Sequence, residues 1–405
     1  MSRRVALLAG AWVLSGTSLL AQPLTEQAAL QRMRAEYPEV RALRLQVREL
    51  DADVRLRTLP TNPTVSYTRE DAGLTVDDFL VVSQELPWRG RRRLLREVAD
   101  RQVSAAEAGA DASMLAAESD LRLVFTDLLV AQARASSLQT GKNELASLAS
   151  VLVAREEQGE GSRFDRLRVE REVAEVEADL AATDIARDVA RTRLASFFRP
   201  GTAAASLSVV GSLDERPALP GITAAAAADQ RADYRALTLD EARWAAERRA
   251  AERLRLPSAS LAGGLKRAET AGSSDTGYAV TAAVSVPIFS RGQAEVARAD
   301  AGRARAAAER VALAASIAAD VDAARAAALQ YRELADRYQA DSVDRATALV
   351  AIATAAYEEG EYGILELLDA HRVTLQTRLR QIALSAAARR GAIALDRAVG
   401  RQVMP

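Results

Sequence analysis

Apolar residues recur along this chain with two different periods. From residue 91 to about 198, and again from about 293 to 399, they step by three, four and seven, as in the heptad pair Leu145 and Leu152. This spacing predicts long helices that pack along a coiled-coil stripe. No proline occurs between residues 91 and 158, and a helix of that length reaches about 100 Å at 1.5 Å per residue. We therefore predict rods rather than a compact helical core.

Two shorter stretches alternate apolar and polar residues, as β-strands do. They span about 63–86 and about 258–286, and a polar turn divides each into a hairpin of two strands. In the last strand, the apolar residues of one face are Tyr278, Val280, Ala282, Val284 and Val286. Each strand has about nine or ten residues, which is enough to cross a bilayer when tilted, and the alternation is typical of membrane β-barrels.

A barrel in lipid must be closed, because an open sheet edge leaves backbone groups without hydrogen-bond partners. Four strands from one chain are too few. Three chains would supply about twelve strands around an aqueous lumen, whereas two would supply about eight around an interior filled by side chains. The sequence therefore predicts a mixed α and β fold, mainly α: a trimeric 12-stranded transmembrane β-barrel, four strands per chain, continued by a long tube of helices.

The order of short helix, hairpin, long rod, glycine turn and return helix occurs twice. Gly360 lies 201 positions after Gly159, and each is followed by an apolar residue at the fifth position and an acid at the sixth. Repetition of independent features in register favours an internal duplication. The chain then divides into a signal peptide (1–21), a first repeat (22–201), a linker (202–231), a second repeat (232–400) and a tail (401–405), with long helical hairpins at about 91–198 and about 293–399.

The segment 1–21 has the pattern of a secretory signal. Arg3 and Arg4 precede an apolar run, and a candidate cleavage site follows Ala21. The alternative is a transmembrane anchor. The run is short for that purpose and contains two glycines, so we expect export.

Composition narrows the function further. The 54 basic and 55 acidic residues nearly cancel, so no global field attracts nucleic acid, and we expect no nucleic acid partner. The chain has no cysteine and one histidine, His371, which we interpret as a solvated helix residue rather than a metal ligand. No nucleophile–base set, phosphate loop or carboxylate pair is evident. We therefore expect no enzyme, no catalytic residue, no cofactor and no metal site.

Taken with these patterns, the motifs resemble those of the TolC-like outer-membrane efflux proteins, over essentially all of the mature chain. The resemblance rests on the proline-containing hairpin ends Glu85–Gly90 and Val286–Gly292 and on both glycine turns. It implies a homotrimer in the outer membrane of a Gram-negative-type cell, in contact with outer-membrane lipid and extended by a periplasmic α-helical barrel. Pro87–Arg93 and Leu365–Arg372 are similar to members that serve heavy-metal or other cation efflux.

The same resemblance implies a function and its partners. The protein would be the exit duct of a tripartite efflux system, passively conducting substrates from the periplasm to the exterior. Its partners would be a periplasmic adaptor (membrane fusion) protein and an inner-membrane pump of the resistance-nodulation-division type. Alternatives are a periplasmic coiled-coil scaffold or adhesin, and the same duct serving type I protein secretion or drug efflux.

The resemblance also places a gate at the two helix turns. The constricting acids of the family fall on Asp165, Glu366 and Asp369, and its gate tyrosine falls on Tyr357. Tyr362 stands where a basic partner is often found. The turn residues that would dock the adaptor are Gly159, Glu160, Gly161, Gly360, Glu361 and Gly363.

Two of these assignments have a simpler interpretation. Three copies of each acid would form rings that attract cations and resist closure. Alternatively, Glu366 and Asp369 merely favour the N-terminus of their own helix. Arg91–Arg93 is interpreted as the junction between rod and barrel, with contact to phosphate or a lipid headgroup as the alternative.

Overall fold

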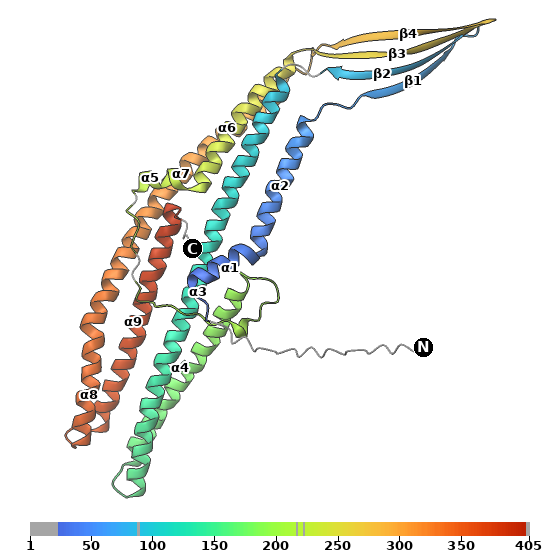
Figure 1. Ribbon diagram of the computed structural model, residues 1–405. Helices are drawn as coiled ribbons and strands as arrows, with labels where there is room; N and C mark the ends of the chain where they lie inside the picture. Colours follow the sequence, from blue (N-terminus) through green and yellow to red (C-terminus); the bar gives the residue numbers. More distant parts are fainter. Residues whose placement is uncertain (1–22, 87–89, 216–217, 222, 402–405) are drawn as a thin grey trace, which may run out of the picture.

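The structure, a computed structural model, describes residues 23–86, 90–215, 218–221 and 223–401. The expected signal peptide and residues 402–405 of the expected tail lie outside the described residues. The molecule is long and narrow, with four strands extending from one end of the helices and two helix turns at the opposite end (Figure 1).

Four strands form one antiparallel sheet in the order β1-β2-β3-β4. They are β1 (Thr64–Asp71), β2 (Thr75–Leu86), β3 (Ser258–Thr270) and β4 (Ser273–Ser285). Gly73 and Gly272 lie in the tight turns within the two hairpins and have positive φ angles of 80° and 106°, which glycine adopts without steric cost. Both predicted hairpins are therefore present, and β2 pairs with β3 to join them.

The strand register gives the sheet one apolar face and one polar face. Opposed residues of adjacent strands lie on the same face, as in the row Tyr67, Leu80, Leu265 and Tyr278. The large apolar residues of this face are Val65 and Tyr67; Leu80, Val82 and Leu86; Leu261 and Leu265; and Tyr278, Val280 and Val284. The opposite face carries mainly small, hydroxyl and charged side chains. The face predicted for the last strand is confirmed, except that Val286 follows the end of β4.

Helices, several of them long, make up most of the remainder of the described chain. The first half contains α1 (Glu26–Glu36), α2 (Pro38–Thr58), α3 (Arg91–Glu157), α4 (Arg163–Ala195) and the short η1 (Ala204–Ser206). The second half contains α5 (Ala224–Gln230), α6 (Ala232–Glu252), η2 (Arg253–Arg255), α7 (Gln293–Tyr338), η3 (Gln339–Val343), α8 (Asp344–Glu358) and α9 (Ile364–Val399). Among the described helices, none is long and apolar enough to cross a membrane.

The helices form a wall one layer thick. Near the sheet, α3 packs against α2 and α6, and α6 packs against α7. Near the turns, α3 packs against α4 and α9, and α9 packs against α7 and α8. The two edges of the wall are therefore α2 with α4 on one side, and α7 with α8 on the other.

Two details differ from the expected rods. The return helix α4 has 33 residues and α3 has 67, so α4 accompanies only the half of α3 near the turn, and α2 and α6 accompany the other half. The second rod is interrupted by the π-helical turn η3. A π turn adds a residue without requiring glycine or proline, so the apolar pattern does not reveal it.

Small residues allow this wall to be thin. A Cβ added to Gly302 of α7 would lie 2.4 Å from the ring of Trp244 in α6. A Cβ added to Gly391 of α9 would lie 2.9 Å from the Cα of Ala328 in α7. The alanine- and glycine-rich sequence is thus explained by close packing between helices.

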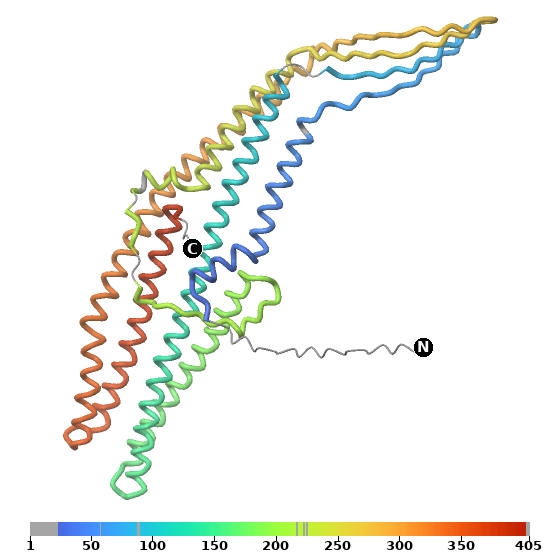
Figure 2. Tube along the Cα trace, in the orientation of Figure 1, coloured from blue at the N-terminus to red at the C-terminus, as the bar shows by residue number. Residues whose placement is uncertain are grey.

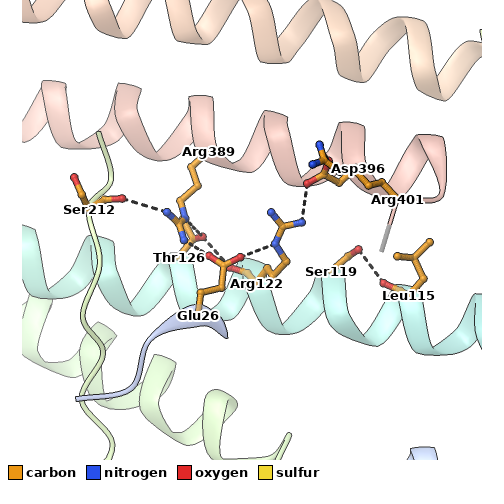
Figure 3. A network of polar contacts seen from close by, with 9 residues as sticks. All are labelled: Glu26, Leu115, Ser119, Arg122, Thr126, Ser212, Arg389, Asp396 and Arg401. Atoms are coloured by element: carbon orange, nitrogen blue, oxygen red, sulfur yellow. Dashed lines mark hydrogen bonds and ion pairs between the residues drawn. The ribbon is translucent and has the colours of Figure 1, made fainter. Parts of the chain in front are cut away.

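Two segments that are mostly not helical, residues 23–25 and 196–215, form a belt that crosses the wall near its middle. After α4, residues 196–215 run across the wall to α9, where the Ser212 carbonyl accepts a hydrogen bond from Arg389 and the Asp214 carboxylate accepts one from Ser385 (Figure 2). A single parallel bridge between Leu24 and Val209 ties the two segments together. Glu26 holds the belt to the wall, because its carboxylate accepts hydrogen bonds from Arg122 of α3 and Arg389 of α9 (Figure 3).

Candidate functional site

The two helix turns have the same backbone geometry. Gly159 and Gly360 both have φ of +78°. In the first turn, the Glu160 N–H donates to the Arg155 carbonyl at 2.9 Å, and in the second, the Glu361 N–H donates to the Ala356 carbonyl at 2.8 Å. This is the left-handed cap that ends many helices, and it requires glycine for its positive φ. Equal caps at equivalent positions support the interpretation of the two turns as copies.

The second glycine of each turn has a different role. A Cβ at Gly161 would lie 2.7 Å from the backbone nitrogen of Glu156, so only glycine allows this close approach. A Cβ at Gly363 would meet only the Glu366 carboxylate, at 3.0 Å, which is a flexible group. The second turn is therefore less constrained in sequence than the first.

An apolar cluster holds the helix ends together next to the turns. Its buried members come from all four helices: Leu138, Leu145 and Leu152 of α3, Val169 and Val176 of α4, Ala353 of α8, and Ile364, Leu367 and Leu368 of α9. The two return helices are not equivalent, however. Leu368 is buried, whereas Leu167, at the matching position of α4, is 48% exposed. The reason is that α9 lies between two neighbours, and α4 lies at an edge of the wall.

The three predicted acids lie in the first two turns of the return helices. Asp165 is half-buried, and Glu366 and Asp369 are exposed. Within the described chain, no salt bridge is formed by any of the three. Glu366 lies beside Gly363, which begins its own helix. That position agrees with the simpler interpretation of Glu366 as a group favoured by the helix N-terminus.

The two predicted tyrosines have different surroundings. Tyr357 packs against the apolar cluster, and the Arg155 guanidinium lies 5.4 Å from its ring centroid. The Arg155 Nη1 atom is also 3.5 Å from the Tyr357 hydroxyl oxygen. Tyr357 therefore connects the end of α8 to the end of α3. Tyr362 is 46% exposed. Glu160 and Glu361 are also exposed.

The structure reveals a cross-link that the sequence did not predict. Arg372 of α9 donates two hydrogen bonds to Glu172 of α4, at 3.0 and 2.9 Å. The Glu172 side chain is only 13% exposed, and the Arg372 side chain is 48% exposed. The hydrogen bonds from Arg372 lower the pKa of Glu172 below its usual value, and those same bonds raise the pKa of Arg372. A bidentate ion pair thus joins the two return helices near the turns.

A signal for this pair is present in the heptad pattern. Glu172 lies seven residues after Asp165, and Arg372 lies three residues after Asp369, so each shares a helix face with a predicted acid. Following these faces by one or two turns would have led to both residues.

His371 is less exposed than expected. Its side chain is 14% exposed, and its Nδ1 atom lies 3.4 Å from a carboxylate oxygen of Glu144 in α3. The interpretation as a solvated residue is therefore wrong, because α9 packs this face against α3. No group of three or more His, Cys, Asp or Glu side chains that could hold a metal ion occurs among the described residues.

No protein-family model matches the sequence, and no curated protein matches it. Solved structures do match. The MtrE outer membrane channel of Neisseria gonorrhoeae, in its open state, has a TM-score of 0.77 and 21% identity, covering 93% of this chain and 88% of MtrE. The CmeC outer membrane channel of Campylobacter jejuni has a TM-score of 0.76 and 15% identity, covering 98% of this chain and 94% of CmeC.

CusC, which was studied for folding and transmembrane channel formation, has a TM-score of 0.74 and 19% identity, covering 93% of this chain and 92% of CusC. At these identities, the comparisons establish the fold. The chain has the mainly α fold with a four-stranded sheet of these channels, as the resemblance implied. The matched proteins are channels rather than enzymes. Their similar TM-scores give no preference for one branch of the family.

Proposed function

We propose that this chain is the outer-membrane exit duct of a tripartite efflux system and that three copies form it. The observation that carries the proposal is the open-edged, continuous wall. A sheet with one apolar face passes directly into a single layer of helices, and both end at unpaired edges on the same two sides. Such a wall is one segment of a tube.

The sheet edges support closure by copies of the same chain. In the described sheet, β1 and β4 each have one neighbour. Adjacent strands are antiparallel throughout the sheet, so β1 and β4 run in opposite directions. The β4 strand of one copy can therefore form an antiparallel pair with the β1 strand of the next copy. Closure removes both edges, which lipid does not tolerate. Three copies supply about twelve strands and a lumen that stays aqueous.

The helix edges also carry apolar side chains that are exposed to solvent. On α4, Ile185 is 67% exposed, and on α8, Ile352 is 59% exposed. These helices lie at opposite edges of the wall, so each would meet the other in the neighbouring copy. The same closure therefore covers both the strand edges and the exposed apolar residues.

The apolar face of the sheet suits an outer membrane. From Tyr278 to Val284 it extends about 20 Å along the strand at roughly 3.3 Å per residue. This length is of the order of the ~25 Å apolar band of outer-membrane barrels. The helices would then extend into the periplasm, with the turns at the far end.

In this arrangement the turns form the periplasmic entrance. Three copies of Asp165, Glu366 and Asp369 would give rings of negative charge that favour cations and oppose full closure. In the resting state, the Arg372–Glu172 pair would hold the two return helices together, and Tyr357 would hold the end of α8 to the end of α3. The exposed turn residues would dock a periplasmic adaptor, and an inner-membrane pump would supply the energy, with no catalytic step in this chain.

A membrane insertion experiment tests the proposal. Val280→Arg places a charge on the apolar face, and Thr281→Arg places the same charge on the polar face of the same strand. We expect the first to cost about 2–4 kcal/mol of membrane stability and to reduce trimer recovery from outer membranes, and the second to be tolerated. Equal effects would contradict the assignment of the faces.

The purified, unmodified protein provides the wider test. We expect a trimer in detergent and discrete conductance steps in planar bilayers. A monomer that is silent in bilayers and fractionates with soluble periplasmic proteins would instead support the coiled-coil scaffold. Genes adjacent to this one would distinguish a cation-efflux pump from a drug pump or a peptide-exporting ATPase.

A further inference from the structure

A cavity at the junction of sheet and helices has no role in the proposed gate. Its volume is about 340 Å³, and it lies where β2, β3 and β4 meet the ends of the helices. Among the described residues that line it, three are arginines: Arg91 and Arg92 from the first turn of α3, and Arg253 from η2. Glu85 is the one carboxylate in this described part of the lining. The cavity therefore has an excess of positive charge.

The guanidinium groups are available to a ligand. Arg92 is half-buried, and its Nε atom donates to the Thr58 carbonyl at 2.6 Å, which fixes the side chain and leaves its terminal nitrogens for other partners. Arg91 and Arg253 are exposed. Across the described ranges of the chain, no salt bridge joins any of these three arginines to a carboxylate. Leu95 and Leu254 form apolar walls beside them.

The strand register shows on which side of the sheet the cavity lies. Glu85 is opposite Ser260, and Ser258 is opposite Ser285. Since residues 258 and 260 are two apart on one strand, all four lie on the polar face. Glu85, Ser258 and Ser285 line the cavity. The fourth strand residue in the lining, Leu86, belongs to the apolar face, so the cavity lies at the strand ends with most of its strand lining on the face that would enclose the lumen.

We infer that this cavity is an anion-binding site on the lumen side of the duct, and that it takes phosphate or carboxylate groups of solutes in transit. The inference rests on the proposed function for its luminal position. Guanidinium groups bind such oxyanions through paired, charge-assisted hydrogen bonds. In a trimer the sites form a ring of arginines at the barrel end, whereas the acids lie at the turn end. The two ends of the duct then favour ions of opposite sign.

Single-channel recording tests the site, with inorganic phosphate as the probe. The test variant is Arg91→Gln with Arg253→Gln; Arg92 is retained because it anchors the Thr58 carbonyl. The control is Arg93→Gln with Arg96→Gln, which removes the same charge from exposed positions on α3 that do not line the cavity. In about 0.1 M salt, where the Debye length is ~10 Å, we expect the test variant to shift the reversal potential toward cation selectivity. It should also raise the phosphate concentration for half-block by about tenfold.

The outcomes distinguish failure of the anion site from failure of the proposed function. Both effects should weaken at about 1 M salt, where screening shortens to ~3 Å, and the control should behave like the unmodified protein. Equal shifts in the two variants, or none in either, would overturn the site while leaving a conducting channel and the proposed function intact. If the unmodified protein does not conduct, the proposed function fails, and the luminal assignment fails with it. Broadening of the phosphorus-31 signal of phosphate by the detergent-solubilised protein, lost only in the test variant, reports binding without conduction.

Discussion

The cross-link between Arg372 and Glu172 makes the sharpest prediction about the proposed gate. Replacing either residue with alanine removes two hydrogen bonds of 2.9–3.0 Å between α9 and α4. Exposed ion pairs contribute about 0.2–1 kcal/mol, and bidentate geometry with one shielded partner places this pair near the top of that range. We therefore expect a coupling free energy of about 1 kcal/mol per chain.

In a trimer that opens as a unit, three such pairs break together. Their combined loss of about 3 kcal/mol corresponds to roughly a hundredfold shift toward the open state. Single-channel open probability should therefore rise in Arg372→Ala, in Glu172→Ala and, by no further amount, in the double variant. Arg380→Ala is the matched control, because Arg380 is exposed on the same helix and forms no salt bridge with the described residues. Additive effects of the two replacements would refute direct coupling.

The same pair predicts a dependence on pH. The hydrogen bonds from Arg372 lower the pKa of Glu172 below its ordinary value of about 4.5 in this structure. A lowered pKa means that the stabilisation is complete above the ordinary value and is lost as the pH falls through the lowered one. Open probability should rise below about pH 4.5, and this component should be absent in Glu172→Gln. An identical acid response in Glu172→Gln would show that other carboxylates control it.

Two further predictions concern the stability of the wall and its belt. Gly302→Ala should lower the free energy of unfolding by about 1–3 kcal/mol, because the added Cβ overlaps the ring of Trp244. The control is Gly109→Ala, whose Cβ meets no atom within 4 Å and which should be neutral or stabilising in thermal melts. Glu26→Gln should lower the free energy of unfolding by about 3 kcal/mol, because two largely buried arginines lose their shared carboxylate. The control is Asp51→Asn, which breaks an exposed pair within one helix and should change the melting temperature little. If a variant and its control lost equal stability, the overlap with Trp244 or the loss of the Glu26 carboxylate would be refuted as the cause.

The sequence of this protein predicts its local structural features with little ambiguity. The heptad pair Leu145 and Leu152 is buried, as its spacing predicts, because a helix returns to the same face every seven residues. The alternation in β4 likewise separates Tyr278 and Val280 from the polar face without reference to a partner strand. The positive φ of Gly159 and Gly360 follows from the same kind of local steric rule.

Arrangements between distant segments needed the tertiary structure. Glu172 and Arg372 are 200 residues apart, and their contact depends on α4 and α9 approaching across α3. The burial of His371 and the cavity formed by Arg91 and Arg253 depend in the same way on which helices are neighbours. Periodicity specifies which face of a helix is buried, but not which helix covers it. The sequence alone therefore determined the hairpins, the long helices and their turns, because these follow from local periodicity and steric rules. Only packing decided the order of the wall, the π turn η3, the surroundings of His371, the partners of the charged residues and the position of the arginine-lined junction.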